Sequence, residues 1–320
     1  MRILILGAGG VGGYFGGRLV EAGADVTFLV RPARARLLRE NGLVIKSPAG
    51  DARLEVKTLA AGEGARRFDL ALVACKAYDL DTAIDAVEPH VDDGAVALPL
   101  LNGMAHNDRM RERLGHGRVV GGVAKCSTKV NAAGEIEHLN AAAQLIFGSF
   151  ADQPNRNEID PVLNDFLAAT AKANFKSKRS DPIDQDLWDK WVMLASLAGM
   201  TALMRASVGE IMATKEGHEL MAEFLEEAVA VATESEYPPA PETLAAMRKL
   251  LFEPGSRFTA SMLRDMEAGG PIEGDHIIGD MYRRAHDMGL DAHLLRIAYC
   301  HLQAYDARRA KSAGVLDRKS

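Results

Sequence analysis

The sequence of 320 residues predicts an α/β domain, built on a doubly wound parallel sheet, followed by an all-helical domain. In the first half, short and almost continuously apolar runs alternate with helical segments, which is typical of parallel strands covered on both faces. From about residue 157 onward, only helical patterns remain. We therefore expect one domain over residues 1–178 and a second over 179–320, with the polar stretch 176–184 as the linker region.

The expected elements follow one another with short connections. The apolar runs predict strands over 2–6, 25–30, 69–76 and 95–103, and the segments between them predict helices over 11–22 and 79–88. Shorter alternating segments over 118–148, with a turn at Ala133–Gly134, should extend this sheet or form an antiparallel edge. The later periodic segments predict helices over 157–173, 186–204, 207–213, 216–235, 240–252, 258–267, 274–288 and 292–310.

Composition and charge exclude several classes of protein. A net charge of −6 argues against non-specific binding to nucleic acid, which requires a basic surface. The apolar run 191–204 is too short to cross a bilayer, and the N-terminal apolar run is too short for a signal peptide. The three cysteines and nine histidines show neither a disulfide framework nor a metal-binding spacing. We expect a cytoplasmic protein that carries no metal ion.

A glycine-rich turn directly follows the first predicted strand. Residues 7–12, GAGGVG, match the GxGxxG fingerprint of dinucleotide-binding Rossmann-type domains, and they begin a helix as that fingerprint requires. Gly7 permits the tight turn, Gly9 lets the backbone approach a pyrophosphate, and Gly12 lets the helix pack on the strand. The alternative is a glycine-rich turn without a ligand.

The ends of the next strands indicate the kind of dinucleotide. Arg31 stands at the end of the second strand, where an acidic residue would hold the ribose of NAD. A guanidinium suits a 2′-phosphate, so we expect NADP(H) rather than NAD, unless Arg31 is a solvated loop residue. Lys76 and Asn102 end two further strands and should face the same crevice. Alternatively, Lys76 caps a strand in solvent and Asn102 fills a turn.

Together these residues resemble the ketopantoate reductase (2-dehydropantoate 2-reductase) family over essentially the whole chain. GAGGVG, Arg31, CK at 75–76 and NGM at 102–104 match the order and spacing of the family's N-terminal domain. LWDKW at 187–191 resembles the family's lysine-bearing helix, and SMLRDMEAGGPIE at 261–273 resembles its serine and glutamate motif.

This resemblance implies a reaction and a set of roles. The reaction is NADPH-dependent reduction of a small 2-keto acid, most directly 2-dehydropantoate to D-pantoate in pantothenate and coenzyme A synthesis. Lys190 would be the general acid and contact the substrate, and Glu273 would lie beside it and orient the site. Asn102 and Ser261 would bind the substrate. The cofactor would be held by Gly7, Gly9, Gly12, Arg31, Lys76 and Asn102.

The chemistry of ketone reduction gives Lys190 a purpose that does not depend on the resemblance. Hydride addition leaves an alkoxide, whose charge must be met by a nearby donor or protonated as it forms. Burial would lower the pKa of Lys190, and a nearby carboxylate such as Glu273 would raise it again. In the rival interpretation, Lys190 pairs with Asp186 on the same helix. Ser261 would then be an ordinary helix-start serine, and Glu273 a first-turn residue favoured by the helix dipole.

Two positions depart from the family pattern. Many members carry asparagines four and eight residues after the lysine, on the same helical face, where this sequence has Leu194 and Ala198. Each hydrogen bond to a charged group contributes roughly 1.5–3 kcal/mol, so their loss should weaken the binding of an oxygen-rich substrate. A 2-keto acid with a larger or more apolar tail is therefore an alternative to 2-dehydropantoate.

Two other functions stay open on the sequence. One is another NAD(P)-dependent dehydrogenase with the same two-domain plan, acting on glycerol 3-phosphate or a 3-hydroxy acid, although the placement of Lys190, Ser261 and Glu273 argues against it. The other is a non-catalytic protein that senses NADPH. The length and apolar faces of the helical domain permit a homodimer, which the resemblance also suggests.

Overall fold

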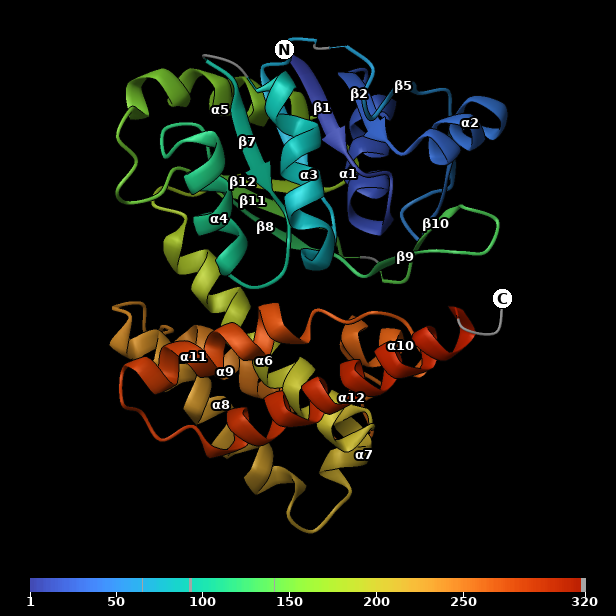
Figure 1. Ribbon diagram of the computed structural model, residues 1–320. Coiled ribbons are helices and arrows are strands. Elements are labelled where there is room, and N and C mark those ends of the chain that lie inside the picture. The colour runs from blue at the N-terminus through green and yellow to red at the C-terminus, as the bar shows by residue number, and fades with distance from the viewer. Residues whose placement is uncertain (65, 92–93, 141, 318–320) are drawn as a thin grey trace. The chain divides into compact units, whose positions relative to one another are not determined.

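The computed structural model describes residues 1–64, 66–91, 94–140 and 142–317, and it contains two compact units (Figure 1). The first unit comprises Met1–Leu101 and His106–Leu187, and the second comprises Asn102–Ala105 and Trp188–Ser320. All strands of the described residues belong to the first unit, whereas the second is helical, so the predicted fold class is confirmed. The first unit extends to Leu187, beyond the domain division that the sequence placed after residue 178.

Five parallel strands form the central sheet of the first unit, in the order β5-β2-β1-β6-β7. Leu6 of the middle strand pairs with Leu29 on one side and Val73 on the other. Because all neighbours are parallel, the carboxyl ends of these strands lie at one edge of the sheet. The strands are β1 (Arg2–Leu6), β2 (Asp25–Val30), β5 (Lys57–Ala60), β6 (Leu70–Val73) and β7 (Val96–Pro99).

Alternate residues of this sheet are buried on opposite faces. Ile3 and Ile5 belong to a core that includes α1, whereas Leu4 and Leu6 belong to another that includes α3 and α4. Burial on both faces explains why the strands read as continuous apolar runs. The helical elements of this part of the chain are α1 (Gly10–Glu21), α2 (Pro32–Asn41), η1 (Ala77–Asp79), α3 (Leu80–Val87), η2 (Glu88–His90), α4 (Ala105–Leu114) and α5 (Arg156–Thr170).

The region 118–148 contributes to two further sheets. The antiparallel pairing that we expected there is confirmed for β9 with β10 and for β8 with β11. Gly134 has a φ of +80° in the predicted turn between β9 and β10. In the described residues, this region extends the central sheet only through a bridge between Ala97 and Val119. The two sheets have the orders β4 (Ala52–Leu54), β3 (Leu43–Lys46), β10 (Ile136–His138), β9 (Thr128–Val130) and β12 (Lys176–Arg179), β11 (Gln144–Gly148), β8 (Gly121–Lys125).

The predicted linker at 176–184 and the prediction that only helices follow residue 157 are wrong for the same reason. Lys176–Arg179 forms the strand β12, which pairs in parallel with β11. Its basic and polar side chains are exposed or partly exposed at the edge of the sheet, where charged residues are common. Ile183, in the same stretch, is fully buried. A charged, polar sequence therefore marked an edge strand rather than a flexible connection.

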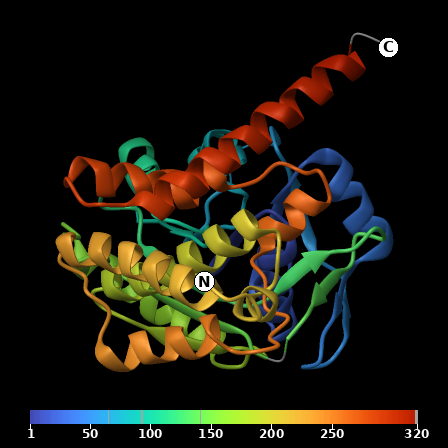
Figure 2. The same ribbon diagram turned by 90° about the horizontal axis from the view of Figure 1, so that it is seen from below.

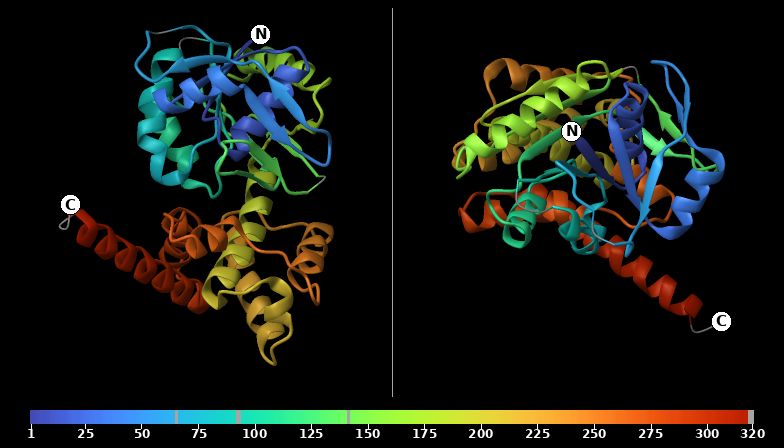
Figure 3. Two further views of the ribbon diagram at one scale, coloured as in Figure 1. Left: turned by 90° about the vertical axis from the view of Figure 1, so that its right-hand side faces the viewer. Right: turned by 90° about the horizontal axis from the view of Figure 1, so that it is seen from above.

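The second unit is a set of packed helices that agree with the predicted helical segments. Its hydrophobic core includes Trp191, Val192, Ala195 and Ala198 of α6. Within this unit, α12 runs past the other helices toward its C-terminal end (Figures 2 and 3). The helices are α6 (Asp184–Met204), which begins in the first unit, α7 (Val208–Met212), α8 (Gly217–Glu234), α9 (Pro241–Leu251), α10 (Ser261–Glu267), the π-helical η3 (Asp275–Gly279), α11 (Asp280–Asp287) and α12 (His293–Asp317).

The apolar run of α6 is explained by burial within the second unit. Gly199 lets the ring of Phe224 approach, since a Cβ at this position would lie 2.2 Å from Cζ of that ring. No helix among the described residues is long and apolar enough to cross a membrane. The run after Lys190 is therefore core, and Lys190 stands at its beginning.

Candidate active site

The glycine-rich turn joins the end of β1 to the beginning of α1. Gly7 has a φ of +92°, which a side chain would strain, and its N–H donates to Leu29 O at 3.0 Å. A Cβ at Gly12 would lie 2.2 Å from Gly7 O, so only glycine lets the helix approach the turn this closely. The local geometry is the one that the fingerprint predicted.

The same turn fits a dinucleotide at Gly9. A Cβ built at Gly9 meets no described atom within 4 Å, so a side chain there would fill the space beside the helix start. Gly9 makes no side-chain capping bond, and the first turn of α1 carries no acidic residue. The first N–H groups of α1 and the positive end of its dipole thus suit an anion such as a pyrophosphate.

Arg31 lies at the end of β2, next to β1, where the sequence placed it. It precedes α2, and its guanidinium is 3.0 Å from a carboxylate oxygen of Asp79, at the end of η1. The Arg31 side chain is 78% exposed, so this ion pair contributes at most about 1 kcal/mol. Lys76 is partly buried directly before η1, beyond the end of β6.

Two residues beside the glycine turn were not predicted. Arg34 donates from Nη2 to Ala8 O at 3.1 Å, and burial lowers the pKa of its guanidinium. Thr128 approaches from β9, because a Cβ at Gly10 would lie 2.9 Å from Thr128 Oγ1. Arg34 is one helical turn after Arg31 in the sequence, a signal that could have been used. The approach of Thr128 depends on sheet packing, which the sequence does not display.

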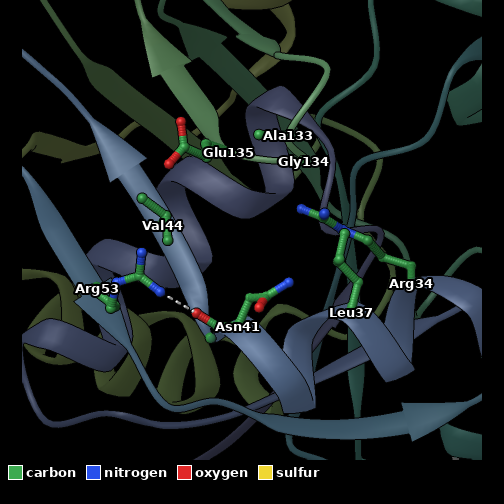
Figure 4. A pocket seen from close by; sticks show the side chains of 9 residues that line it. Arg34, Leu37, Asn41, Val44, Arg53, Ala133, Gly134 and Glu135 are labelled. Carbon is green, nitrogen blue, oxygen red and sulfur yellow. Dashed lines mark hydrogen bonds between the residues drawn. The ribbon is translucent and has the colours of Figure 1, made fainter.

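Arg34 also lines a pocket of about 210 Å³ (Figure 4). The pocket lies between α2, β3, β4 and the turn before β10, and Arg53 on its wall donates to Asn41 O at 2.7 Å. Glu135, at the turn before β10, also lines the pocket (Figure 4). None of the predicted site residues lines this pocket, so it is separate from the glycine turn apart from the shared Arg34.

In the second unit, Lys190 and Glu273 lie on segments that are bonded to each other. The Trp191 indole N–H, next to Lys190 on α6, donates to Ile277 O at 3.0 Å. Ile277 N in turn donates to Glu273 O at 3.0 Å. Glu273 is 5% exposed at the entry to η3, and Lys190 is partly buried. The segment that carries the buried Glu273 is thereby bonded to the turn of α6 that carries Lys190.

The Asp186 carboxylate, which the rival interpretation pairs with Lys190, accepts a hydrogen bond from Ser180 Oγ at 2.6 Å. This bond engages Asp186 with the loop after β12, in the first unit. The first turn of α6, which precedes Lys190, is thus anchored by the bond between Ser180 and Asp186.

Asn102 and Ser261 complete the predicted set in the second unit. Asn102 is partly buried in the turn Asn102–Ala105, and Gly103 beside it has a φ of +81°. That turn contacts His276 of η3, a residue that sequence reasoning did not single out. Ser261 is the first residue of α10 and is partly buried, as expected for a helix-start serine.

The two positions that depart from the family pattern differ in burial. Ala198 is fully buried in the hydrophobic core of the second unit, whereas Leu194 is partly buried and packs against that core. Of these two positions, only Leu194 therefore keeps some accessible apolar surface.

No disulfide joins Cys75, Cys126 and Cys300. In the part of the chain that the structure describes, no group of three or more His, Cys, Asp or Glu side chains could hold a metal ion. The chemistry that the arrangement supports is proton donation and anion binding, by the lysine, the arginines and the helix start of α1.

Comparison with known proteins supports the resemblance to the ketopantoate reductase family. The family model described as ketopantoate reductase PanE/ApbA matches residues 3–152, and the model of its C-terminal part matches residues 182–306. The chain is 34% identical over 309 residues to a Bacillus subtilis (strain 168) protein named uncharacterized oxidoreductase YkpB, covering 97% of this chain and 100% of that one.

Solved structures show the same fold over nearly the whole chain. The 2-dehydropantoate 2-reductase from Geobacter metallireducens GS-15 is 27% identical, with a TM-score of 0.84 over 95% of this chain and 99% of that one. The ternary structure of D-mandelate dehydrogenase with NADH and anilino(oxo)acetate is 19% identical, with a TM-score of 0.85 over 97% and 100% of the two chains. The second likeness is one of fold.

Proposed function

Because the chain belongs to the ketopantoate reductase family, we propose that it reduces a 2-keto acid to the 2-hydroxy acid with NADPH. The family makes the chain an oxidoreductase. The first candidate substrate is 2-dehydropantoate, which would yield D-pantoate. In this proposal the first unit holds the dinucleotide and the second supplies the groups that act on the keto acid.

One observation carries the proposal. The bond from Trp191 Nε1 to Ile277 O connects the turn of α6 that bears Lys190 with the segment that bears the buried Glu273. A nearby carboxylate can orient a lysine ammonium, whereas burial lowers the pKa of the lysine and lets it give up its proton more readily. In the rival interpretation, Lys190 pairs with Asp186 on the same helix and Glu273 is a first-turn residue favoured by the helix dipole, a role that does not require the burial of Glu273.

The proposed roles follow from the charge that develops during reduction. NADPH, when bound, supplies the hydride to the ketone carbon. Lys190 donates a proton to the carbonyl oxygen as the alkoxide forms, and Glu273 orients the Lys190 ammonium. Asn102 and Ser261 donate hydrogen bonds that orient the substrate, and Asn102 also contacts the cofactor. Each hydrogen bond becomes stronger as negative charge develops on the oxygen that accepts it.

The cofactor preference rests on the strand ends of the first unit. Arg31 presents an exposed guanidinium at the end of β2, and Asp79 is its partner in the structure. A 2′-phosphate offers Arg31 a stronger, bidentate partner than a single exposed carboxylate. Together with Lys76 this favours NADPH over NADH.

A second candidate substrate is a 2-keto acid with a larger or more apolar tail. Leu194 supports it, because this side chain places apolar surface one turn after Lys190 where an asparagine would offer an amide. An apolar substrate tail gains from contact with such a side chain, at about 25 cal/mol per Å² of buried surface.

Steady-state kinetics across a series of 2-keto acids distinguishes the two candidates. If 2-dehydropantoate is the substrate, it gives the highest kcat/KM of the series, and Leu194→Asn leaves that order unchanged. If the apolar candidate is correct, a branched or aromatic 2-keto acid gives the highest kcat/KM, and Leu194→Asn shifts the preference toward 2-dehydropantoate. NADPH binding without turnover on any member would contradict both and favour an NADPH sensor.

The homodimer and the cytoplasmic location stay predictions. Sedimentation at several protein concentrations tests the homodimer, and fractionation of cells tests the location.

A further inference from the structure

The π-helical segment η3 contains a histidine to which the roles above give no function. His276 is partly buried and follows Glu273 by less than one helical turn. Single π-helical turns are rare and frequently occur at functional sites, where they change the direction of side chains. In this structure, η3 places His276 in contact with another segment of the second unit.

His276 lies against the turn that carries Asn102. A Cβ built at Gly103 would be 2.8 Å from His276 O, 2.9 Å from Cδ2 of the ring and 3.4 Å from Nε2. Both the backbone and the ring of His276 therefore touch the backbone of Gly103. The positive φ of Gly103 and this close approach each require glycine at that position.

The two sides of this contact are fixed independently within the second unit. On one side, Met104 packs against the hydrophobic core of the helices. On the other side, Ile277, the residue after His276, accepts the indole N–H of Trp191 on α6. His276 thus stands between the turn that bears Asn102 and the segment that is bonded to the Lys190 turn.

Several charged groups act on the His276 ring. Burial lowers the pKa of the ring, and the carboxylates of Glu273, Asp280 and Asp275 oppose that effect. The Arg283 guanidinium adds to the lowering. The ring is neutral near pH 7 as a result, and it gains a positive charge among three carboxylates as the pH falls.

We propose that His276 is a positioning residue, whose ring and carbonyl hold the Asn102–Gly103 turn against the segment that carries Glu273. The inference rests on the proposed function, since it gives Asn102 a fixed place relative to the groups that bind the keto acid. Protonation of the ring changes the contact with Gly103 and so couples the Asn102 turn to pH. His276 acts through Asn102 and does not itself touch the reacting atoms.

The kinetic test uses His276→Gln and His276→Phe in the full-length protein. The KM for the keto acid should rise roughly tenfold with a smaller change in kcat, because a misplaced Asn102 binds the substrate poorly. The part of the acidic fall of kcat/KM that follows protonation of the His276 ring should disappear in both variants, whereas the part that follows protonation of Glu273 should remain. His286→Gln, at an exposed histidine of α11, should leave KM and the pH profile unchanged. An unchanged KM and acidic limb in the His276 variants would overturn the proposal.

A second measurement does not depend on turnover. In the NMR spectrum of the unliganded protein, the Gly103 amide resonance should shift with pH at the same midpoint as the His276 ring. His276→Gln should abolish the Gly103 titration, and His286→Gln should preserve it. A Gly103 amide that does not follow the His276 ring would contradict the inference even if the protein reduces 2-keto acids. Conversely, coupled titrations in a protein that reduces no 2-keto acid would overturn the proposed function alone.

Discussion

The two units place their candidate site residues by different physical means. In the first unit, Gly7, Arg31 and Lys76 all follow strands of one parallel sheet, so strand order alone brings them to one edge. In the second unit, Lys190 lies on α6 and Glu273 lies just before η3, and the bond from Trp191 to Ile277 connects these two segments, which are far apart in the chain. A site at the carboxyl ends of parallel strands can be predicted from a sequence motif. A site formed between helices depends on how the helices pack, which the spacing of residues in the sequence does not show.

The largest expected effect comes from removing the lysine of the helical site. Lys190→Ala should lower kcat by about 10²–10⁴-fold, the usual contribution of a positioned acid, and leave the Kd for NADPH unchanged. Stopped-flow turnover and fluorescence titration with NADPH measure the two quantities. Lys215→Ala, at a side chain that is 94% exposed, is the matched control and should behave as the wild type. Equal losses of kcat and NADPH affinity would contradict the division of roles, in which the second unit donates the proton and the first unit binds the cofactor.

Closing the space beside the glycine turn should weaken cofactor binding without unfolding the protein. Gly9→Ala meets no described atom within 4 Å, so the free energy of unfolding should change little. The methyl group would obstruct the approach of a pyrophosphate, and the Kd for NADPH should rise at least about tenfold, or ~1.4 kcal/mol. Gly64→Ala also points into open space and provides the control. If both variants bind NADPH equally well, the turn does not hold the dinucleotide.

The end of β2 should discriminate between the two nicotinamide cofactors. Arg31→Ala should raise the KM for NADPH about tenfold and leave that for NADH nearly constant, since one charge-assisted bond contributes roughly 1.5–3 kcal/mol. Parallel kinetics with both cofactors provide the ratio. Arg36→Ala, at an exposed position of α2, controls for the loss of positive charge. The assignment of Arg31 fails if the variant weakens NADPH and NADH to the same extent.

The smallest effect concerns the stability of η3 in the second unit. Burial alone would raise the pKa of Asp275, but hydrogen bonds from Arg283 and Tyr299 outweigh it and hold that pKa below its usual value. A lowered carboxyl pKa stabilises the fold above the unfolded-state pKa, and this stabilisation is lost as the pH falls through the folded-state pKa. Asp275→Asn should therefore lower the free energy of unfolding near neutral pH, by less than about 1 kcal/mol because the pair is exposed.

Urea unfolding at several pH values checks this last prediction. The stability difference between Asp275→Asn and the wild type should shrink as the pH falls below about 4, near the unfolded-state pKa of aspartate. Asp287→Asn, at an exposed carboxylate of α11, should show no such trend. A difference that grows toward acid pH would contradict the lowered pKa.

Much of the fold could be predicted because the apolar periodicity matched the final burial. Residues 2–6 and 25–30 form strands with the predicted bounds, and the long helix that bears Lys190 was placed within two residues. The edge strand β12 was missed because its alternating polar residues cover no apolar face, which is the signal that strand prediction uses. The bounds of short strands depend on neighbours that the local sequence does not specify.

The candidate site was predictable where residue type and strand end coincide. Gly7, Gly9 and Gly12 lie at the turn between β1 and α1 that the dinucleotide fingerprint describes, and Arg31 lies at the end of β2. The approaches of Thr128 to Gly10 and of His276 to Gly103 were not predictable, because each joins elements from different parts of the chain. Ser261 is the first residue of α10, which is compatible with the alternative that it is an ordinary helix-start serine. Its role in binding the substrate stays a prediction.

The most direct test of the account is the stoichiometry of NADPH oxidation in the presence of a 2-keto acid. The absorbance of reduced nicotinamide is followed while the 2-hydroxy acid is quantified in the same reaction, for the wild type and for Lys190→Ala. We expect one 2-hydroxy acid for each NADPH consumed by the wild type, and a rate at least about a hundredfold lower with Lys190→Ala. NADPH that binds but is not consumed with any 2-keto acid, or a rate in Lys190→Ala equal to that of the wild type, would contradict the account.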